Sequence, residues 1–268
     1  MKKHIIDKLK SLERENDITI LYACESGSRA WGFDNVESDY DVRFIYKRNN
    51  LREYLTLSDK SDVIEYSGDN IDIVGWDIKK ALKLHYSGNP NLREWLLSPI
   101  KYINWDTNIF EGLEEFDMAK LKYHYTSIAV NNWKKLSRND SDLTKRDLKM
   151  LLYNCRCVLI WNVIDQGDDP SINVSDLLGQ VKNLDDDIAC DINSLISFYK
   201  HNCQDDLNPD AIGNIKQWMG YNLTVMRRDL PKTDDSRNFD RYDERFFELL
   251  LPGYDNSDKQ TLSKTLLI

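Results

Sequence analysis

The chain has 268 residues, of which 41% are hydrophobic, and its formal net charge is −9. This length suits one large domain or two modest ones, and the hydrophobic fraction suffices for a core. No apolar run approaches the roughly 20 residues that a membrane span requires, and the N-terminal segment lacks the apolar region of a signal peptide. Because the five cysteines are odd in number and scattered, we expect reduced thiols in a cytoplasmic protein without a membrane partner.

The first hundred residues combine helical and strand patterns. Apolar residues three and four positions apart indicate helices, and short β-branched runs between polar residues indicate strands. The predicted segments are, in chain order, a helix at 2–16, strands at 18–24, 40–46, 62–66 and 71–76, and helices at 78–87 and 91–97. The segment at 67–70 predicts a hairpin turn.

From about residue 106 onward the pattern is helical throughout. Apolar residues at helical spacing predict helices at 118–136, 144–163, 184–199, 209–226 and 239–251. Periodic helices without strands are typical of an all-α domain. We therefore predict an α+β protein, with a small mixed sheet flanked by helices in residues 1–105 and a helical domain in residues 106–268.

One stretch near the N-terminus carries a phosphate-binding pattern. The strand at 18–24 leads through Glu25-Ser26 into Gly27-Ser28 and then into a helical turn. Such a turn leaves backbone N–H groups and a hydroxyl free to hold a phosphate. The next residue, Arg29, either reaches a phosphate or forms an ion pair with a nearby acidic side chain.

The following strand begins with two acidic residues, Asp39 and Asp41, which project to the same side because they are two apart. Two neighbouring carboxylates repel each other, and a divalent cation relieves that repulsion. Asp72 is a third carboxylate, flanked by apolar residues in a strand that should lie beside the second. It either joins the pair around a metal or lies on the solvent face of an edge strand.

These residues together resemble the signature of the polymerase-beta-like nucleotidyltransferase superfamily. The signature consists of Gly-Ser, then Asp-x-Asp, then an Asp between hydrophobic residues, and here it reads Gly27-Ser28, Asp39-Tyr40-Asp41 and Ile71-Asp72-Ile73-Val74. Flanking strings at 25–33, 38–44, 75–82 and 89–99 are similar to the branch called RNA-ligase-associated polymerases. The resemblance is strong over residues 15–105 and weak in the helical remainder.

The resemblance implies an enzyme of the EC 2.7.7 type that transfers a nucleoside monophosphate from a nucleoside triphosphate, such as ATP, to an acceptor hydroxyl. It assigns Gly27 and Ser28 to the β- and γ-phosphates, and Asp39 and Asp41 to one or two Mg²⁺ (or Mn²⁺) ions. Asp72 would share the second metal and lower the pKa of the attacking hydroxyl. The branch name points to an RNA acceptor, with tRNA ends in repair or end modification as the expected substrate.

A basic segment offers a possible RNA-binding surface. Residues 120–156 contain nine Lys/Arg against three Asp, a net charge of +6, interleaved with aromatic residues. Alternatively, the aromatics face the core and the basic residues only solvate two helices. Two other functions remain open, namely nucleotidylation of a protein or small molecule and a non-enzymatic nucleotide-sensing or antitoxin-like role. The sequence gives no indication of an oligomeric state.

Overall fold

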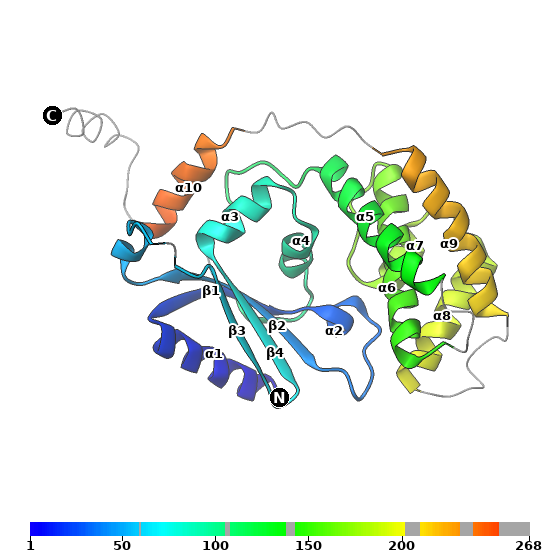
Figure 1. Cartoon of the computed structure of the whole chain (residues 1–268), viewed down its shortest axis with the longest axis horizontal. Helices are drawn as coiled ribbons and strands as arrows, with labels where there is room; N and C mark the ends of the chain where they lie inside the picture. Colours follow the sequence, from blue (N-terminus) through cyan, green and yellow to red (C-terminus); the bar gives the residue numbers. More distant parts are fainter. Residues whose placement is uncertain (59, 105–107, 138–142, 202–209, 231–237, 252–268) are drawn as a thin grey trace.

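The N-terminal region forms one five-stranded sheet with helices on both faces (Figure 1). The computed structural model describes residues 1–58, 60–104, 108–137, 143–201, 210–230 and 238–251. The elements of this region are α1 (Lys2–Asn16), β1 (Ile18–Glu25), α2 (Gly27–Trp31), β2 (Tyr40–Arg48), the 3₁₀ helix η1 (Leu51–Tyr54), β3 (Val63–Gly68), β4 (Ile71–Asp77), α3 (Ile78–Tyr86), α4 (Pro90–Leu96) and β5 (Lys101–Ile103).

The sheet is mixed, and its strand order is β3-β4-β2-β1-β5. β2 pairs in parallel with β4, whereas the β1–β2, β3–β4 and β1–β5 pairs are antiparallel. The parallel pair places Asp41 directly opposite Asp72. The prediction that the strand carrying Asp72 lies beside the second strand is confirmed.

Each face of the sheet buries its own apolar layer. One layer joins Ile5 and Leu9 of α1 to Phe44 and Tyr46 of β2. Ile45, which points the other way because side chains alternate along a strand, belongs to the layer beneath α3, α4 and α10 (Asp240–Leu250). The middle of β2 is therefore buried on both faces, as expected for a strand in the interior of a sheet.

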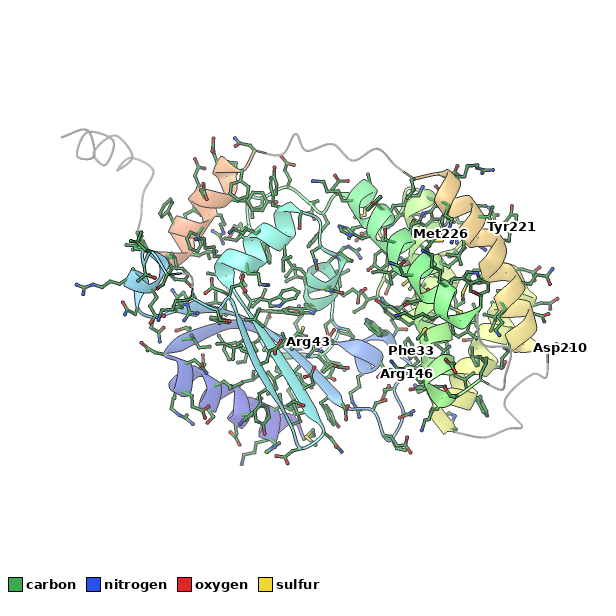
Figure 2. All side chains as sticks on the ribbon, viewed as in Figure 1. Phe33, Arg43, Arg146, Asp210, Tyr221 and Met226 are labelled. Carbon is green, nitrogen blue, oxygen red and sulfur yellow. The ribbon has the colours of Figure 1, made fainter. Side chains whose placement is uncertain are left out.

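The second half of the chain forms a helical bundle beside the sheet (Figure 1). Its helices are α5 (Met118–Leu136), α6 (Lys145–Asp165), α7 (Val174–Gln180), α8 (Asp186–His201) and α9 (Ala211–Arg228). The predicted capping box at the start of α6 is present, with Thr144 and Asp147 bonded reciprocally. Figure 2 labels Phe33 where α2 meets this bundle, and Phe33 is buried in the bundle's apolar core.

The α+β prediction is confirmed, although the sequence patterns missed two elements. β5 has three residues, too few for a periodic pattern. α7 has seven, as α4 has, but it lacks the proline at its first position that marked α4. The last helix, α10, packs on α3 through Tyr242, which lies edge-on to Tyr86. A division into residues 1–105 and 106–268 stays a prediction, and α10 lies with the first of these two parts. In the ranges given above, no helix is both long and apolar enough to cross a membrane.

Candidate active site

The predicted phosphate-binding turn lies between the end of β1 and the short helix α2. Gly27 has a φ of 61°, a left-handed conformation that favours glycine. A Cβ at this position would lie 2.0 Å from Oδ2 of Asp41. The glycine therefore allows the Asp41 carboxylate to approach the turn closely. Ser28 is buried, and its backbone carbonyl accepts hydrogen bonds from the N–H groups of Gly32 and Phe33.

Asp41 and Asp72 are held together by one basic side chain. Nη2 of Arg43 lies 2.9 Å from Oδ1 of Asp41 and 2.9 Å from Oδ2 of Asp72. The parallel pairing of β2 with β4 sets the two carboxylates opposite each other, and residue 43 is on the same side of β2 as residue 41. Asp72 thus faces the guanidinium of Arg43 although its side chain is 43% exposed, and its place around a metal stays a prediction.

The third carboxylate, Asp39, lies exposed immediately before β2. Burial raises the pKa of the Asp41 carboxyl, the guanidinium of Arg43 opposes that rise, and the charges of Asp72 and Asp39 add to it. Asp39 is thus close enough to Asp41 to interact with it electrostatically. The ammonium of Lys149 acts on the Asp41 pKa in the same direction as Arg43.

These residues suit a divalent metal by their chemistry. Carboxylate oxygens are the ligands that Mg²⁺ prefers, and the Arg43 guanidinium already places positive charge between Asp41 and Asp72. Among the described residues, however, no three His, Cys, Asp or Glu side chains are arranged so that they could hold a metal ion. Asp39 would have to turn toward the other two carboxylates to complete such a site.

A buried acid, Glu25, holds the backbone of Asp41 in place. Oε1 of Glu25 accepts a 2.9 Å hydrogen bond from the backbone N–H of Asp41, and the Tyr102 hydroxyl donates to Oε2. Glu25 is fully buried, and this burial raises its pKa. Sequence reasoning did not single out Glu25, although an acidic residue that ends a buried strand was an available signal.

A cavity of about 380 Å³ opens onto Gly27, Ser28 and Asp41. It is also lined by residues of β4, α4 and α6, namely Val74, Trp76, Asn91, Glu94, Trp95, Lys149 and Tyr153, and by Ser26, Trp31 and Arg43. Lys149 and Tyr153 come from the helical bundle, so the bundle completes this cavity. Sequence reasoning considered both residues only as part of the basic segment and missed their place in the site.

Arg29 does not line this cavity. Its Nη1 lies 3.3 Å from Oδ2 of Asp34, and its Nη2 donates a 2.7 Å hydrogen bond to the carbonyl of Ser38. Its Nε donates to the carbonyl of Asp39, and its guanidinium lies 3.9 Å from the ring centroid of Tyr40. These contacts correspond to the ion-pair alternative, and they hold the loop that leads to Asp39.

The aromatic residues near the site are largely packed. Trp76 stacks on Trp95 with ring centroids 3.7 Å apart. Trp31 packs against Tyr153, with ring centroids 5.0 Å apart, and donates its indole N–H to Oε2 of Glu94. All of these side chains also line the cavity. Each indole ring therefore packs against another aromatic ring and at the same time forms part of the cavity wall.

The basic segment 120–156 does not form one continuous solvent-facing surface. Lys120 and Arg156 are buried, and Lys122 and Lys145 form ion pairs with Asp165 and Glu37. The basic residues of this segment that remain exposed in the described ranges are Lys134, Lys135, Lys145, Arg146 and Lys149. Arg138 lies outside the described residues. The net charge of the segment therefore overstates its solvent-facing charge.

A mixed sheet with a Gly-Ser turn next to paired carboxylates matches what the resemblance to polymerase-beta-like nucleotidyltransferases implies. The comparison with protein families agrees with this class. The chain belongs to the RNA repair pathway DNA polymerase beta family, whose model matches residues 1–248. The resemblance inferred from the Gly-Ser and Asp motifs is thereby confirmed, and the match extends through the helical bundle.

Two individual proteins are similar to this chain. The uncharacterized protein YcgL of Bacillus subtilis (strain 168) is 43% identical over 139 residues, which are 50% of this chain and 53% of that protein. The match therefore spans about half of the relative's length. The crystal structure of a nucleotidyltransferase-like protein from Exiguobacterium sibiricum 255-15 aligns with 91% of this chain and 79% of its own, at 11% identity and a TM-score of 0.31.

Proposed function

We propose that this protein is a metal-dependent nucleotidyltransferase that moves a nucleoside monophosphate from a nucleoside triphosphate to the hydroxyl of an RNA end. The observation that carries this proposal is the close approach of Asp41 to Gly27. Both residues line one cavity, and Asp72 lies opposite Asp41 on the neighbouring strand. A phosphate held by the turn would lie beside the carboxylates. Family membership supports the same reaction class.

In this reaction, different residues of the chain would bind the triphosphate and the metal. The backbone N–H groups at Gly27 and Ser28 would bind the triphosphate, and Lys149 would neutralise part of its charge from the bundle side. Asp39, Asp41 and Asp72 would hold one or two Mg²⁺ ions. Bound there, the metal supplies charge stabilisation for the entering and leaving oxygens of an in-line displacement. The protein itself then contributes positioning within a cavity that α6 lines with Lys149 and Tyr153.

An RNA acceptor is supported by the family description and by the exposed basic residues of α5 and α6. Lys134 and Lys135 end α5, and Arg146 lies near the start of α6. A strand of RNA that followed these residues would approach Lys149 and the cavity. Phosphate contacts of this kind hold a nucleic acid in place without reading its sequence.

The deciding experiment incubates the protein with labelled nucleoside triphosphates and Mg²⁺, in the presence of RNA, of cell lysate protein or of no acceptor. We expect label in RNA, and we expect EDTA to abolish it. Label in protein would select protein nucleotidylation instead. Binding of nucleotide without turnover under all conditions would select a nucleotide-sensing role, and undiminished activity in EDTA would overturn the metal dependence.

Replacing Lys149 with alanine is expected to raise the KM for the nucleoside triphosphate by about tenfold or more. The reason is that a charge-assisted hydrogen bond to a phosphate contributes roughly 1.5–3 kcal/mol. Steady-state kinetics with a fixed acceptor measures the effect. Lys135→Ala is the matched control, because Lys135 is exposed on α5 and does not line the cavity. Equal KM values for the two variants would remove Lys149 from the triphosphate site.

A further inference from the structure

Arg43 makes four contacts at the candidate metal site, and two of them are with backbone carbonyls. Its Nη2 contacts Asp41 and Asp72 at 2.9 Å each. Its Nη1 donates 3.0 Å hydrogen bonds to the carbonyls of Val42 and Asp72. Figure 2 labels Arg43 on the sheet, and its side chain is only 17% exposed. The guanidinium is thus anchored independently of the two carboxylates.

The two oxygens of Asp41 have different surroundings. Oδ2 faces the Gly27 turn, where a Cβ on that glycine would lie 2.0 Å away, and Oδ1 faces Arg43. On the neighbouring strand, Oδ2 of Asp72 also faces Arg43. A cation that bridged Oδ1 of Asp41 and Oδ2 of Asp72 would need the two oxygens that Arg43 contacts. Arg43 and a divalent metal would therefore compete for them.

We propose that Arg43 is the internal counter-cation of the metal site, stabilising the Asp41–Asp72 pair before metal binds and releasing it when metal arrives. The inference rests on the proposed function, which assigns both carboxylates to the metal. The hydrogen bonds from Nη1 to the carbonyls of Val42 and Asp72 let the guanidinium stay anchored while Nη2 gives up its carboxylate contacts. Arg43 is in this sense a positioning residue that sets how tightly the site binds metal.

The test compares wild-type protein with Arg43→Met, using Mn²⁺ alone as the probe. Removing the competing cation is expected to tighten Mn²⁺ binding by about tenfold, which corresponds to about 1.4 kcal/mol. It should also lower the melting temperature of the metal-free protein by about 5 °C, because the two carboxylates then repel each other without compensation. Titration calorimetry gives the affinity, and thermal unfolding with and without Mn²⁺ gives the stability.

Arg48→Met is the matched control on the same strand. Arg48 lies at the far end of β2, is 14% exposed, and bridges Glu53 at 2.9 Å and Asp77 at 3.7 Å. Its removal should lower the melting temperature without changing the affinity for Mn²⁺. Arg43→Lys is the second test variant, since a lysine keeps the charge but cannot bridge two carboxylates and two carbonyls at once. We expect its Mn²⁺ affinity to lie between those of wild type and Arg43→Met.

The outcomes separate this inference from the function on which it rests. If wild-type protein shows no Mn²⁺ binding that Asp41→Asn removes, the proposed metal site itself is wrong. If wild type binds Mn²⁺ at that site but Arg43→Met and Arg43→Lys bind it equally or more weakly, the counter-cation role of Arg43 is overturned. The affinity measurements need no turnover, so an unidentified acceptor does not affect them.

Discussion

Asp41→Asn is expected to lower nucleotide transfer by about a thousandfold or more, because the amide cannot replace a carboxylate as a metal ligand beside the triphosphate. The fold should persist, since the variant loses one partly exposed ion pair with Arg43, a change of about 1 kcal/mol or less. Transfer assays at saturating Mg²⁺ measure the first effect, and thermal unfolding measures the second. Asp39→Asn should behave in the same way.

Asp62→Asn is the control for this series, because Asp62 forms an ion pair with Lys80 and does not line the cavity. It should keep activity close to that of the wild type. Sharp losses of melting temperature in both Asp39→Asn and Asp41→Asn would instead indicate a structural role for the two carboxylates. Full activity in Asp41→Asn would remove the central residue of the proposed site.

Asp72→Ala should act on the chemical step more than on binding. Gly27, Ser28 and the other two carboxylates remain to hold the triphosphate, so its dissociation constant should stay near the wild-type value. The rate should fall by roughly a hundredfold or more, as expected when the group that activates the acceptor hydroxyl is lost. Single-turnover kinetics separates the two quantities. Wild-type turnover in this variant would leave the mechanism without a base.

The largest effect on stability is expected for Glu94→Ala, at about 3–5 kcal/mol of lost unfolding free energy. Glu94 is 4% exposed, and its Oε1 lies 2.7 Å from Nη2 of the fully buried Arg156. The same carboxylate accepts hydrogen bonds from Tyr125 and from the indole N–H of Trp31. Removing it would leave a buried guanidinium without a counter-charge, which is far more unfavourable than losing a surface pair.

Denaturant titration at equilibrium measures this loss. Asp62→Ala serves as the control, because the Asp62–Lys80 pair is solvent-exposed and should contribute no more than about 1 kcal/mol. The double variant Glu94→Met/Arg156→Met should recover part of the stability, since it removes the unpaired charge together with its partner. A loss below 1 kcal/mol for Glu94→Ala would contradict the interpretation of the pair as a buried ionic contact.

The Glu94 network also shows why stability and site geometry are linked in this protein. Trp31 belongs to α2, the helix that follows the phosphate-binding turn, and Glu94 belongs to α4. Arg156 comes from α6, and its guanidinium lies 4.2 Å from the ring centroid of Trp31. One buried carboxylate therefore connects the Gly-Ser turn to the bundle that supplies Lys149 and Tyr153 to the cavity.

The amino-acid sequence alone determined the local elements and the signature. Helices such as α5 and α6 and strands such as β2 follow from the spacing of apolar residues, because that spacing decides which face each element can bury. The Gly27-Ser28 turn and the acidic residues at 39, 41 and 72 could also be recognised in the sequence. Their chemistry depends on residue type and on short-range spacing along one or two strands.

Only the tertiary structure decided which of these side chains meet. The register of β2 against β4 sets Asp41 opposite Asp72 and lets Arg43 reach both, and no pattern within either strand specifies that register. Lys149 arrives at the cavity from a helix more than a hundred residues away from the turn. The tertiary structure also decided which basic residues of segment 120–156 are buried, ion-paired or exposed. That outcome depends on how α6 packs against the sheet region, and the sequence of α6 alone does not specify this packing.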